Sequence, residues 1–229
     1  MKVFTIVGIR SSGKTTTVTR LTEEFKSRGK RVGTVKSIYC PTFSIDNAGS
    51  NTYRHRLSGA EIICAKAKAE TAFVFPRPMS NAQLLSYYQD MDIVILEGDY
   101  LAPVPRLVAA HGEEDASPRI NSLTLALVGR IANTQKEVLG LPAFSPLTDI
   151  AALADFLEER VADITPNDIG ADLPDVPGVT GDGFCQCGCR KHAKKPAAVK
   201  HVTAYVDGKE LTLNKEQEAL LLSLSGENR

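Results

Sequence analysis

The sequence Gly8-Ile9-Arg10-Ser11-Ser12-Gly13-Lys14-Thr15 matches the pattern G-x-x-x-x-G-K-[ST] at every specified position. It follows the short apolar run Val3–Val7, which is typical of a buried parallel strand. Apolar residues then recur near helical spacing from Lys14 to Arg28, and Gly29 ends that stretch. A strand, this loop and a helix in that order predict a phosphate-binding loop (P-loop) at the start of an α/β domain.

The residue types in this loop suit the magnesium complex of a purine nucleoside triphosphate. Gly8 allows a tight turn out of the strand, and Gly13 lets the backbone approach the phosphates. Lys14 is expected to reach the β- and γ-phosphates as a catalytic residue, and the Thr15 hydroxyl is expected to bind Mg²⁺. Backbone N–H groups and the positive end of the helix complete the cradle. The residues expected to contact the nucleotide are Gly8, Ser11, Ser12, Gly13, Lys14, Thr15 and Thr16.

A P-loop site also needs an acid near the metal, at the end of a neighbouring strand. The apolar run Ile93–Leu96 predicts such a strand, and Glu97 closes it. Glu97 is therefore the expected catalytic and Mg²⁺-side carboxylate. Asp46, in a loop after the second expected strand, is the other candidate Mg²⁺ ligand. Asp92 lies at the opposite end of the 92–98 run and is expected to be structural.

Alternating strand and helix signals continue along the chain and predict a mostly parallel, doubly wound sheet of the P-loop NTPase class. Further strands are expected at 31–36, 60–65, 72–75, 92–98, 106–110 and 123–128. Further helices are expected at 51–58, 82–88 and 149–161. These elements define an expected nucleotide-binding domain over residues 1–160.

The composition changes after this domain. Residues 161–183 are rich in Asp, Pro and Gly and predict a linker. Within residues 184–229, two short apolar runs flank Asp207-Gly208, which is a strong β-hairpin signal. Asn214 can then cap a helix, with Gln217 in the capping-box position. The expected fold is thus a P-loop domain followed by a small β-hairpin–helix module.

Bulk composition narrows the expected surroundings of the protein. Lys+Arg and Asp+Glu both number 27 in 229 residues, so no net charge recruits nucleic acid or an anionic membrane. No apolar run approaches the length of a membrane span, and the first residues lack a signal-peptide pattern. We expect a cytoplasmic protein whose partners include neither a membrane nor nucleic acid.

A cluster of thiols forms the second chemical feature. Cys185, Cys187 and Cys189, followed by His192, can converge on one ion, and soft thiolates favour zinc or an iron–sulfur cluster. Two other interpretations stay open: a redox or sulfur-handling role, and incidental exposed thiols. The odd total of five cysteines argues against a disulfide framework, and Cys40 and Cys64 are expected to be buried apolar side chains.

The sequence resembles the molybdopterin-guanine dinucleotide biosynthesis protein B (MobB) family. Four blocks carry the resemblance: 8–16, 32–36, 46–60 and 92–98. In the third block, Asp46, Gly49, Thr52, Arg56, Gly59 and Ala60 match the family pattern or nearly so. Histidines are usual in the family after the lysine of the second block, whereas Ser37–Cys40 follow Lys36 here. The resemblance covers residues 1 to about 160, and the Cys-containing extension lies outside it.

The resemblance implies a homodimeric GTP-binding protein that hydrolyses GTP slowly. It implies an accessory role for the enzyme that couples GMP to molybdopterin, so that guanylyltransferase or a molybdoenzyme is the expected partner. Asp46 and Glu97 then gain weight as metal-side acids, and Arg56 becomes a candidate contact to the second subunit or to a pterin phosphate. For hydrolysis, Arg10 or Arg56 in a dimer is the candidate arginine. The guanine-reading N-K-x-D sequence is absent, and Asn133 is the residue placed where a base reader would sit.

Two other classes of function remain open at this stage. A small-molecule kinase shares the same loop and strand, and Asp99 could then serve as the base that faces the γ-phosphate. A nucleotide-dependent chaperone for metal-cluster insertion would use the cysteines at 185–189. ATP and GTP are not distinguished by the loop itself.

Overall fold

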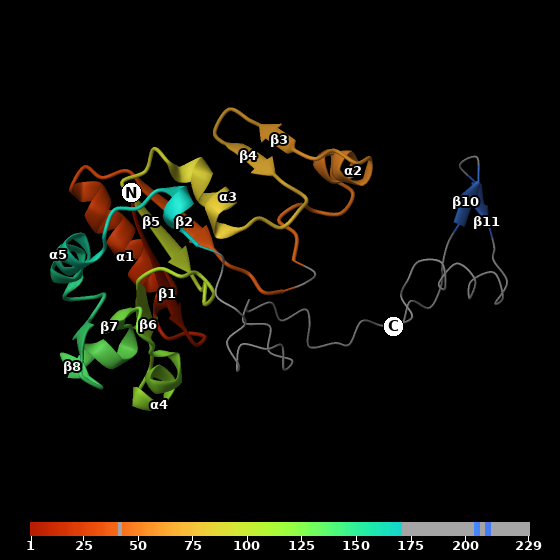
Figure 1. Ribbon diagram of the computed structural model, residues 1–229. Helices are drawn as coiled ribbons and strands as arrows, with labels where there is room; N and C mark the ends of the chain where they lie inside the picture. The colour runs from red at the N-terminus through yellow and green to blue at the C-terminus, as the bar shows by residue number, and fades with distance from the viewer. Residues whose placement is uncertain (41–42, 171–203, 207–208, 212–229) are drawn as a thin grey trace. The chain divides into compact units, whose positions relative to one another are not determined.

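Seven strands form the main sheet of the computed structural model, in the order β2-β5-β1-β6-β7-β9-β8 (Figure 1). The structure describes residues 1–40, 43–170, 204–206 and 209–211. The chain divides into two compact units, Met1–Cys187 and Gly188–Arg229. The strands of the main sheet are β1 (Lys2–Gly8), β2 (Val32–Lys36), β5 (Ile93–Glu97), β6 (Arg106–Ala109), β7 (Thr124–Val128), β8 (Glu137–Val138) and β9 (Leu141–Phe144).

All pairings in this sheet are parallel except that of β8 with β9. The predicted mostly parallel α/β fold is therefore confirmed. The α-helices are α1 (Lys14–Ser27), α2 (Asn51–Leu57), α3 (Asn81–Leu85), α4 (Glu113–Ala116) and α5 (Ile150–Arg160). The short 3₁₀ helices are η1 (Ser86–Tyr88), η2 (Ser117–Arg119), η3 (Arg130–Asn133) and η4 (Pro166–Asp168).

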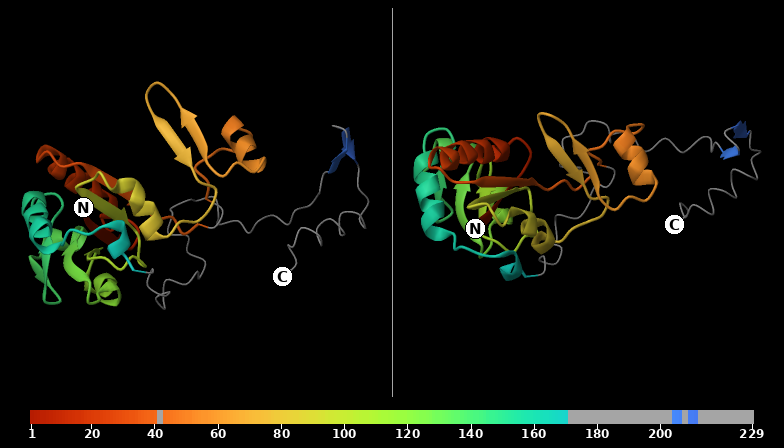
Figure 2. Two further views of the ribbon diagram at one scale, coloured as in Figure 1. Left: turned by 45° about the horizontal axis from the view of Figure 1, so that its top comes forward. Right: turned by 90° about the horizontal axis from the view of Figure 1, so that it is seen from above.

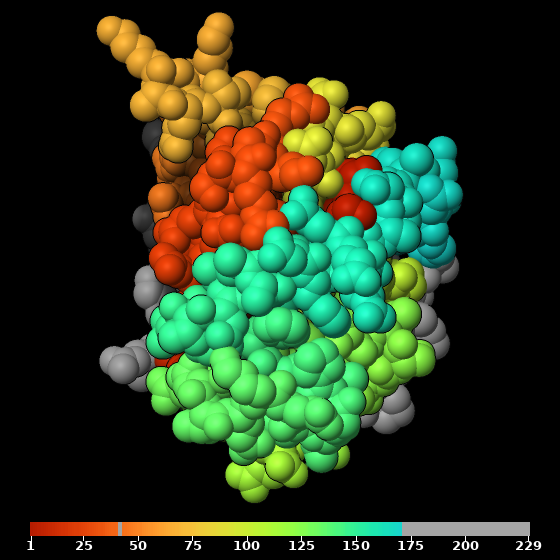
Figure 3. Space-filling view, turned by 90° about the vertical axis from the view of Figure 1, so that its left-hand side faces the viewer, coloured from red at the N-terminus to blue at the C-terminus, as the bar shows by residue number. Residues whose placement is uncertain are grey.

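Alternate residues of the central strands face opposite layers, as the period of two in a strand requires. Phe4 and Ile6 of β1 pack with α1 and α5 in one cluster, while Val3 and Val7 pack with the other face. On the first face α1 and α5 lie side by side (Figures 2 and 3). Arg28, just after α1, binds Asp155 and Glu158 at 2.6 and 2.8 Å. The sheet is thus buried on both faces, which explains the apolar runs of its strands.

The segment between β2 and α3 forms a smaller structure of its own. It contains α2, every residue of which is at least partly exposed, and an antiparallel pair of strands, β3 (Ile63–Lys66) and β4 (Thr71–Val74). Cys40 is buried as expected, but Cys64 is exposed, so that expectation is wrong for Cys64. The reason is that β3 pairs only with β4 and lies outside the main sheet.

The start of the expected linker packs against the P-loop domain. Asp163 forms ion pairs with the N-terminal amine and with Lys2, at 3.4 and 3.3 Å, and Ile169 is buried. The start of this Asp- and Pro-containing sequence is therefore held against the domain by the buried side chain of Ile169 and by the two ion pairs of Asp163. The domain boundaries expected from the sequence remain predictions.

In the second unit, β10 (Ala204–Val206) and β11 (Lys209–Leu211) pair antiparallel, as the Asp207-Gly208 sequence predicts. The helix expected after Asn214 lies outside the described residues. Within the described ranges, no helix has the length and apolar character to cross a bilayer.

Candidate functional site

The loop from Gly8 to Gly13 joins the end of β1 to the start of α1. Gly8 has φ +148°, and a Cβ added there would lie 2.0 Å from the carbonyl oxygen of Ala109, so a side chain is excluded. Gly13, at φ +106°, caps α1, and its carbonyl accepts the N–H of Thr17 at 2.9 Å. The helix therefore begins immediately after the loop, with its unpaired N–H groups at the loop, which is the geometry that binds phosphate.

Three residues that the sequence did not single out hold this loop in place. The Tyr100 hydroxyl donates to the carbonyl of Gly8 at 2.8 Å and accepts the N–H of Gly8 at 2.9 Å. On the other side, the N–H of Arg130 donates to the carbonyl of Ser12 at 3.2 Å. Gly129, at φ +85°, lies so close that an added Cβ would be 2.1 Å from that same Ser12 oxygen. Segments far apart in the sequence thus fix both ends of the loop.

Thr15 and Glu97 meet as the sequence analysis expected. The Thr15 hydroxyl donates to Oε1 of Glu97 at 2.7 Å, and Lys36 Nζ lies 2.5 Å from the same oxygen. Glu97 is buried at 7% exposure, whereas the Lys36 side chain is half exposed. A hydroxyl and a carboxylate at this spacing are hard oxygen donors of the kind that Mg²⁺ prefers. The donor set therefore fits a magnesium ion held beside the loop.

Lys14 lies in a strongly cationic environment. Its ammonium donates to the carbonyls of Gly8, at 2.8 Å, and of Ile9. Burial lowers the pKa of Lys14 to about 8; the charges of Lys36 and Arg119 add to this, and Glu97 opposes it. Several cations around one buried carboxylate favour a bound polyanion, because a phosphate satisfies the excess positive charge.

Arg119 is a further residue that sequence reasoning missed. Its Nη1 donates to the carbonyl of Asp115 at 2.6 Å, while its Nε is buried without a hydrogen-bond partner among the described residues. Its charge reaches Lys14 strongly enough to lower the pKa of that lysine. An Arg on a short 3₁₀ helix carries no sequence signal, because only the tertiary fold brings η2 toward the loop.

Asp46 takes part in a separate hydrogen-bonded group. Its Oδ1 accepts the hydroxyls of Ser50 at 2.7 Å and Thr52 at 2.9 Å, and Ser50 caps α2 through the N–H of Tyr53. These hydrogen bonds lower the pKa of Asp46. Arg56 Nη1 donates to Ser44 Oγ at 3.4 Å in the same segment. The structure thus shows Asp46 supporting a helix start, and its role as a metal ligand stays a prediction.

Two of the remaining candidates, Asp92 and Asn133, accept hydrogen bonds within the fold, and the others lie outside the described residues. Asp92 is structural, since its Oδ2 accepts the N–H of Arg31 at 2.7 Å at the far end of β5. Asn133 Oδ1 accepts the hydroxyl of Ser145 at 2.8 Å. The metal-binding candidates Cys185, Cys187, Cys189 and His192 lie outside the described residues. Within the described part of the chain, no group of three His, Cys, Asp or Glu side chains is arranged to hold a metal.

Comparison with known proteins places this geometry in context. The model of the family "Molybdopterin guanine dinucleotide synthesis protein B" (MobB) matches residues 3–129. A probable molybdopterin-guanine dinucleotide biosynthesis adapter protein of Bacillus subtilis is 27% identical over 142 residues, which span 61% of this chain and 82% of that protein. A putative adapter protein of the same description from Methanocaldococcus jannaschii is 28% identical over 134 residues, 56% of this chain and 55% of that protein.

Solved structures show the same fold. The crystal structure of Bacillus subtilis MobB superposes with a TM-score of 0.58 at 22% identity, covering 72% of this chain and all of that one. A MobB homologue from Bacillus stearothermophilus gives a TM-score of 0.53 at 25% identity, covering 70% of this chain and all of that one.

Proposed function

Because the chain belongs to the MobB family of molybdopterin guanine dinucleotide synthesis proteins, we propose that it binds GTP with Mg²⁺ and acts as an accessory protein in that synthesis. The observation that carries the proposal is the contact of Thr15 with Glu97 at 2.7 Å, directly beside Lys14. A hydroxyl and a carboxylate in contact support a metal site, and the neighbouring Lys14 supports binding of the phosphates.

Each residue of the site has a separate task in this proposal. The backbone of the 8–13 loop and the start of α1 donate N–H groups to the phosphates. The Lys14 ammonium, withdrawn from the carbonyls of Gly8 and Ile9, neutralises the β- and γ-phosphates. Thr15 and Glu97 hold the metal, which supplies charge neutralisation at the phosphates when bound. Asp46 is proposed as a further metal-side acid.

We propose that hydrolysis is slow. Oε1 of Glu97 already receives the Thr15 hydroxyl and the Lys36 ammonium, so this carboxylate is a metal-side group rather than a free base. Besides Lys36, Arg119 is a cation of the same chain whose charge acts on Lys14. A second subunit that supplies Arg10 or Arg56 would complete the site, in line with the expected homodimer.

The test is GTP binding by a Lys14→Ala variant of the full chain. A fluorescent GTP analogue titrated in excess Mg²⁺ should bind the unchanged protein and fail to bind the variant. Lys26→Ala, at an exposed position on the same helix, is the matched control and should bind normally. Equal affinity of Lys14→Ala and the unchanged protein would contradict the proposal, and the same titration with ATP sets the base preference.

The two other functions are separated by different measurements. A small-molecule kinase would form nucleoside diphosphate rapidly only when an acceptor is added; Asp99 would be its base. A cluster-insertion chaperone would lose bound metal when Cys185, Cys187 and Cys189 are replaced together by Ser. Metal analysis after anaerobic purification, before and after this replacement, decides whether zinc or an iron–sulfur cluster is present at all.

A further inference from the structure

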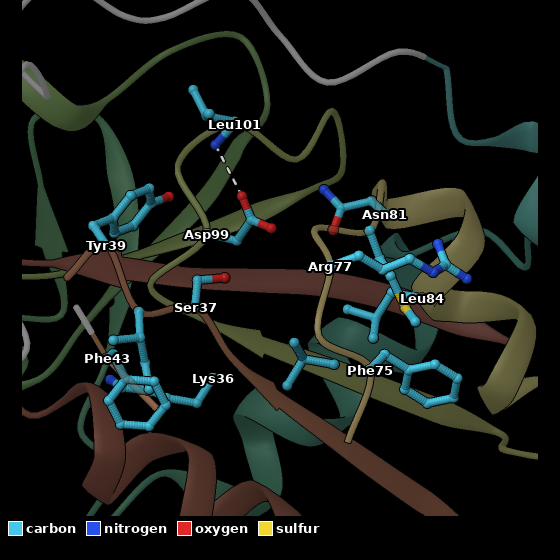
Figure 4. A pocket seen from close by; sticks show the side chains of 13 residues that line it. Lys36, Ser37, Tyr39, Phe43, Phe75, Arg77, Asn81, Leu84, Asp99 and Leu101 are labelled. Atoms are coloured by element: carbon cyan, nitrogen blue, oxygen red, sulfur yellow. Dashed lines mark hydrogen bonds between the residues drawn. The ribbon is translucent and has the colours of Figure 1, made fainter. Parts of the chain in front are cut away.

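A pocket of about 570 Å³ lies next to the metal side of the phosphate loop (Figure 4). It is lined by the end of β2 and the residues after it, by residues that follow β5, by the segment that follows β4 and by α3. Its volume falls in the range of small-molecule sites. Lys36 belongs both to its lining and to the contact with Glu97, so the pocket directly adjoins the expected metal position.

Three aromatic side chains are among the residues that line this pocket. Tyr39 and Phe43 line it with 45% and 53% of their surface exposed, and Phe75 lines it from the segment after β4. The Tyr39 hydroxyl accepts the N–H of Tyr100 at 3.2 Å, which ties this ring to the residue that holds Gly8. Exposed aromatic rings gathered at a pocket offer stacking surface for a flat ring system.

A fixed carboxylate faces the same space. Asp99 is 8% exposed, and its Oδ1 accepts the backbone N–H groups of Leu101 and Ala102, each at 3.0 Å. These two hydrogen bonds orient the side chain, and its other oxygen extends into the pocket toward Asn81 (Figure 4). A carboxylate oxygen is an acceptor only, so it selects a ring edge that carries N–H donors.

Cations supply the complementary charge. Lys36 and Arg77 line the pocket, and Asp99 is the carboxylate among its lining residues. The lining therefore carries a net positive charge, which suits an anionic group on the ligand. Lys36 bonds to Glu97, so the anionic group is expected at the end of the pocket nearest the metal position.

We propose that this pocket binds a pterin phosphate: a flat bicyclic ring whose amino-pyrimidine edge donates N–H groups, joined to a phosphate. The ring stacks on the aromatic wall and donates to Asp99, and the phosphate lies at Lys36. This inference rests on the proposed function, because a pterin is the second component of the dinucleotide. The pocket lies beside β2 and β5, whereas Gly129 and Arg130 flank the loop from the β7 side, which leaves the guanine of GTP to that other side.

The experiment uses the full chain and neopterin monophosphate, whose own fluorescence reports binding. Asp99→Asn keeps an oxygen that can accept the two backbone N–H groups but places an amide donor in the pocket. We expect the variant to bind the probe about tenfold more weakly or worse, since hydrogen bonds to a charged acceptor are strong. Phe43→Ala should weaken binding by roughly tenfold through lost stacking. Phe73→Ala is the matched control and should bind normally, because Phe73 is an exposed aromatic residue (62%, against 53% for Phe43) outside the pocket lining.

Two further titrations distinguish this inference from the proposed GTP site. Asp99→Asn should keep its affinity for GTP, and Lys14→Ala should keep its affinity for the pterin probe while losing GTP. Equal probe binding by the unchanged protein, Asp99→Asn and Phe43→Ala would overturn the pterin site and leave GTP binding intact. Displacement of the probe by GMP as effective as by unlabelled neopterin monophosphate would identify a guanine site instead and also overturn it.

Discussion

Replacing Gly129 by Ala should damage the phosphate loop although Gly129 lies more than a hundred residues away from it along the chain. Gly129 has φ +85°, and its new Cβ would lie 2.1 Å from the Ser12 carbonyl oxygen, where ordinary contacts begin near 3.4 Å. The obstructing atom is backbone, so the loop or the turn at Gly129 must shift by more than an ångström. That movement breaks the hydrogen bond from the Arg130 N–H to Ser12.

The magnitude follows from two separate costs. Gly129 has φ +85° and ψ −149°, a backbone region that essentially only glycine occupies, so an alanine there costs about 1–3 kcal/mol, and the lost hydrogen bond costs roughly 1 kcal/mol more. Gly140→Ala is the matched control, since Gly140 also has a positive φ, +74°, but has no atom within 4 Å of an added Cβ among the described residues. We therefore expect a loss of about 2–4 kcal/mol in the free energy of unfolding for Gly129→Ala, and about 1–2 kcal/mol for Gly140→Ala.

Two assays separate stability from binding. Urea unfolding gives the free energy of each variant, and titration of a fluorescent GTP analogue at low denaturant gives the affinity of the folded protein. Gly129→Ala should lose at least about tenfold in affinity, whereas Gly140→Ala should bind GTP normally. Equal stability and equal GTP affinity of the two variants would refute the argument that the β7–η3 turn sets the position of the loop.

Three further results are expected. Lys14 binds phosphate only as an ammonium, and its pKa is lowered to about 8, so GTP affinity should fall as the pH rises above 8. Lys36→Met should move this fall to higher pH, because the Lys36 charge helps to lower the pKa of Lys14. A GTP affinity that stays constant from pH 7 to 9 would contradict this expectation. Tyr100→Phe should lower the free energy of unfolding by about 1–3 kcal/mol in urea titrations, because Gly8 loses two buried hydrogen bonds. Arg119→Ala should weaken GTP binding by roughly fivefold in the same fluorescence titration, while Arg20→Ala on exposed α1 surface should not.

The central part of the fold could be predicted because its signals are local. A buried strand, the 8–15 loop and an amphipathic helix are adjacent in the sequence, and the acid that closes β5 follows from the apolar run before it. Parallel strands place their carboxyl ends at one sheet edge, so Thr15 and Glu97 had to be near neighbours.

The supports of the site could not be predicted, because they depend on contacts across the sheet. The sequence does not distinguish Tyr100 from other aromatic residues, because its contact with Gly8 depends on β5 lying next to β1. Gly129 has only the signal of a turn residue, because its contact with the loop depends on β7 lying beyond β6. Arg119 lies in a stretch without periodicity. Cys64 has the apolar neighbours of a buried strand, but the short β3–β4 pair has no layer packed over it at that position. A short antiparallel pair of this kind differs from a core strand in whether another layer of the fold packs over it. A single sequence does not contain that information.

The Lys36 side chain contacts Glu97, beside the proposed metal position, and also lines the proposed pterin pocket. If Glu97 held a magnesium ion, the Lys36 ammonium would no longer be needed to balance that carboxylate, and its charge would be available to the pocket that it also lines. The occupancy of one site then changes the free energy of filling the other. Thermodynamic reciprocity fixes the form of this coupling: whatever factor Mg²⁺ and nucleotide contribute to the affinity of the pocket, a ligand in the pocket contributes to the affinity for nucleotide. The nucleotide and the pterin phosphate, the two halves of a dinucleotide, would thus bind cooperatively rather than independently.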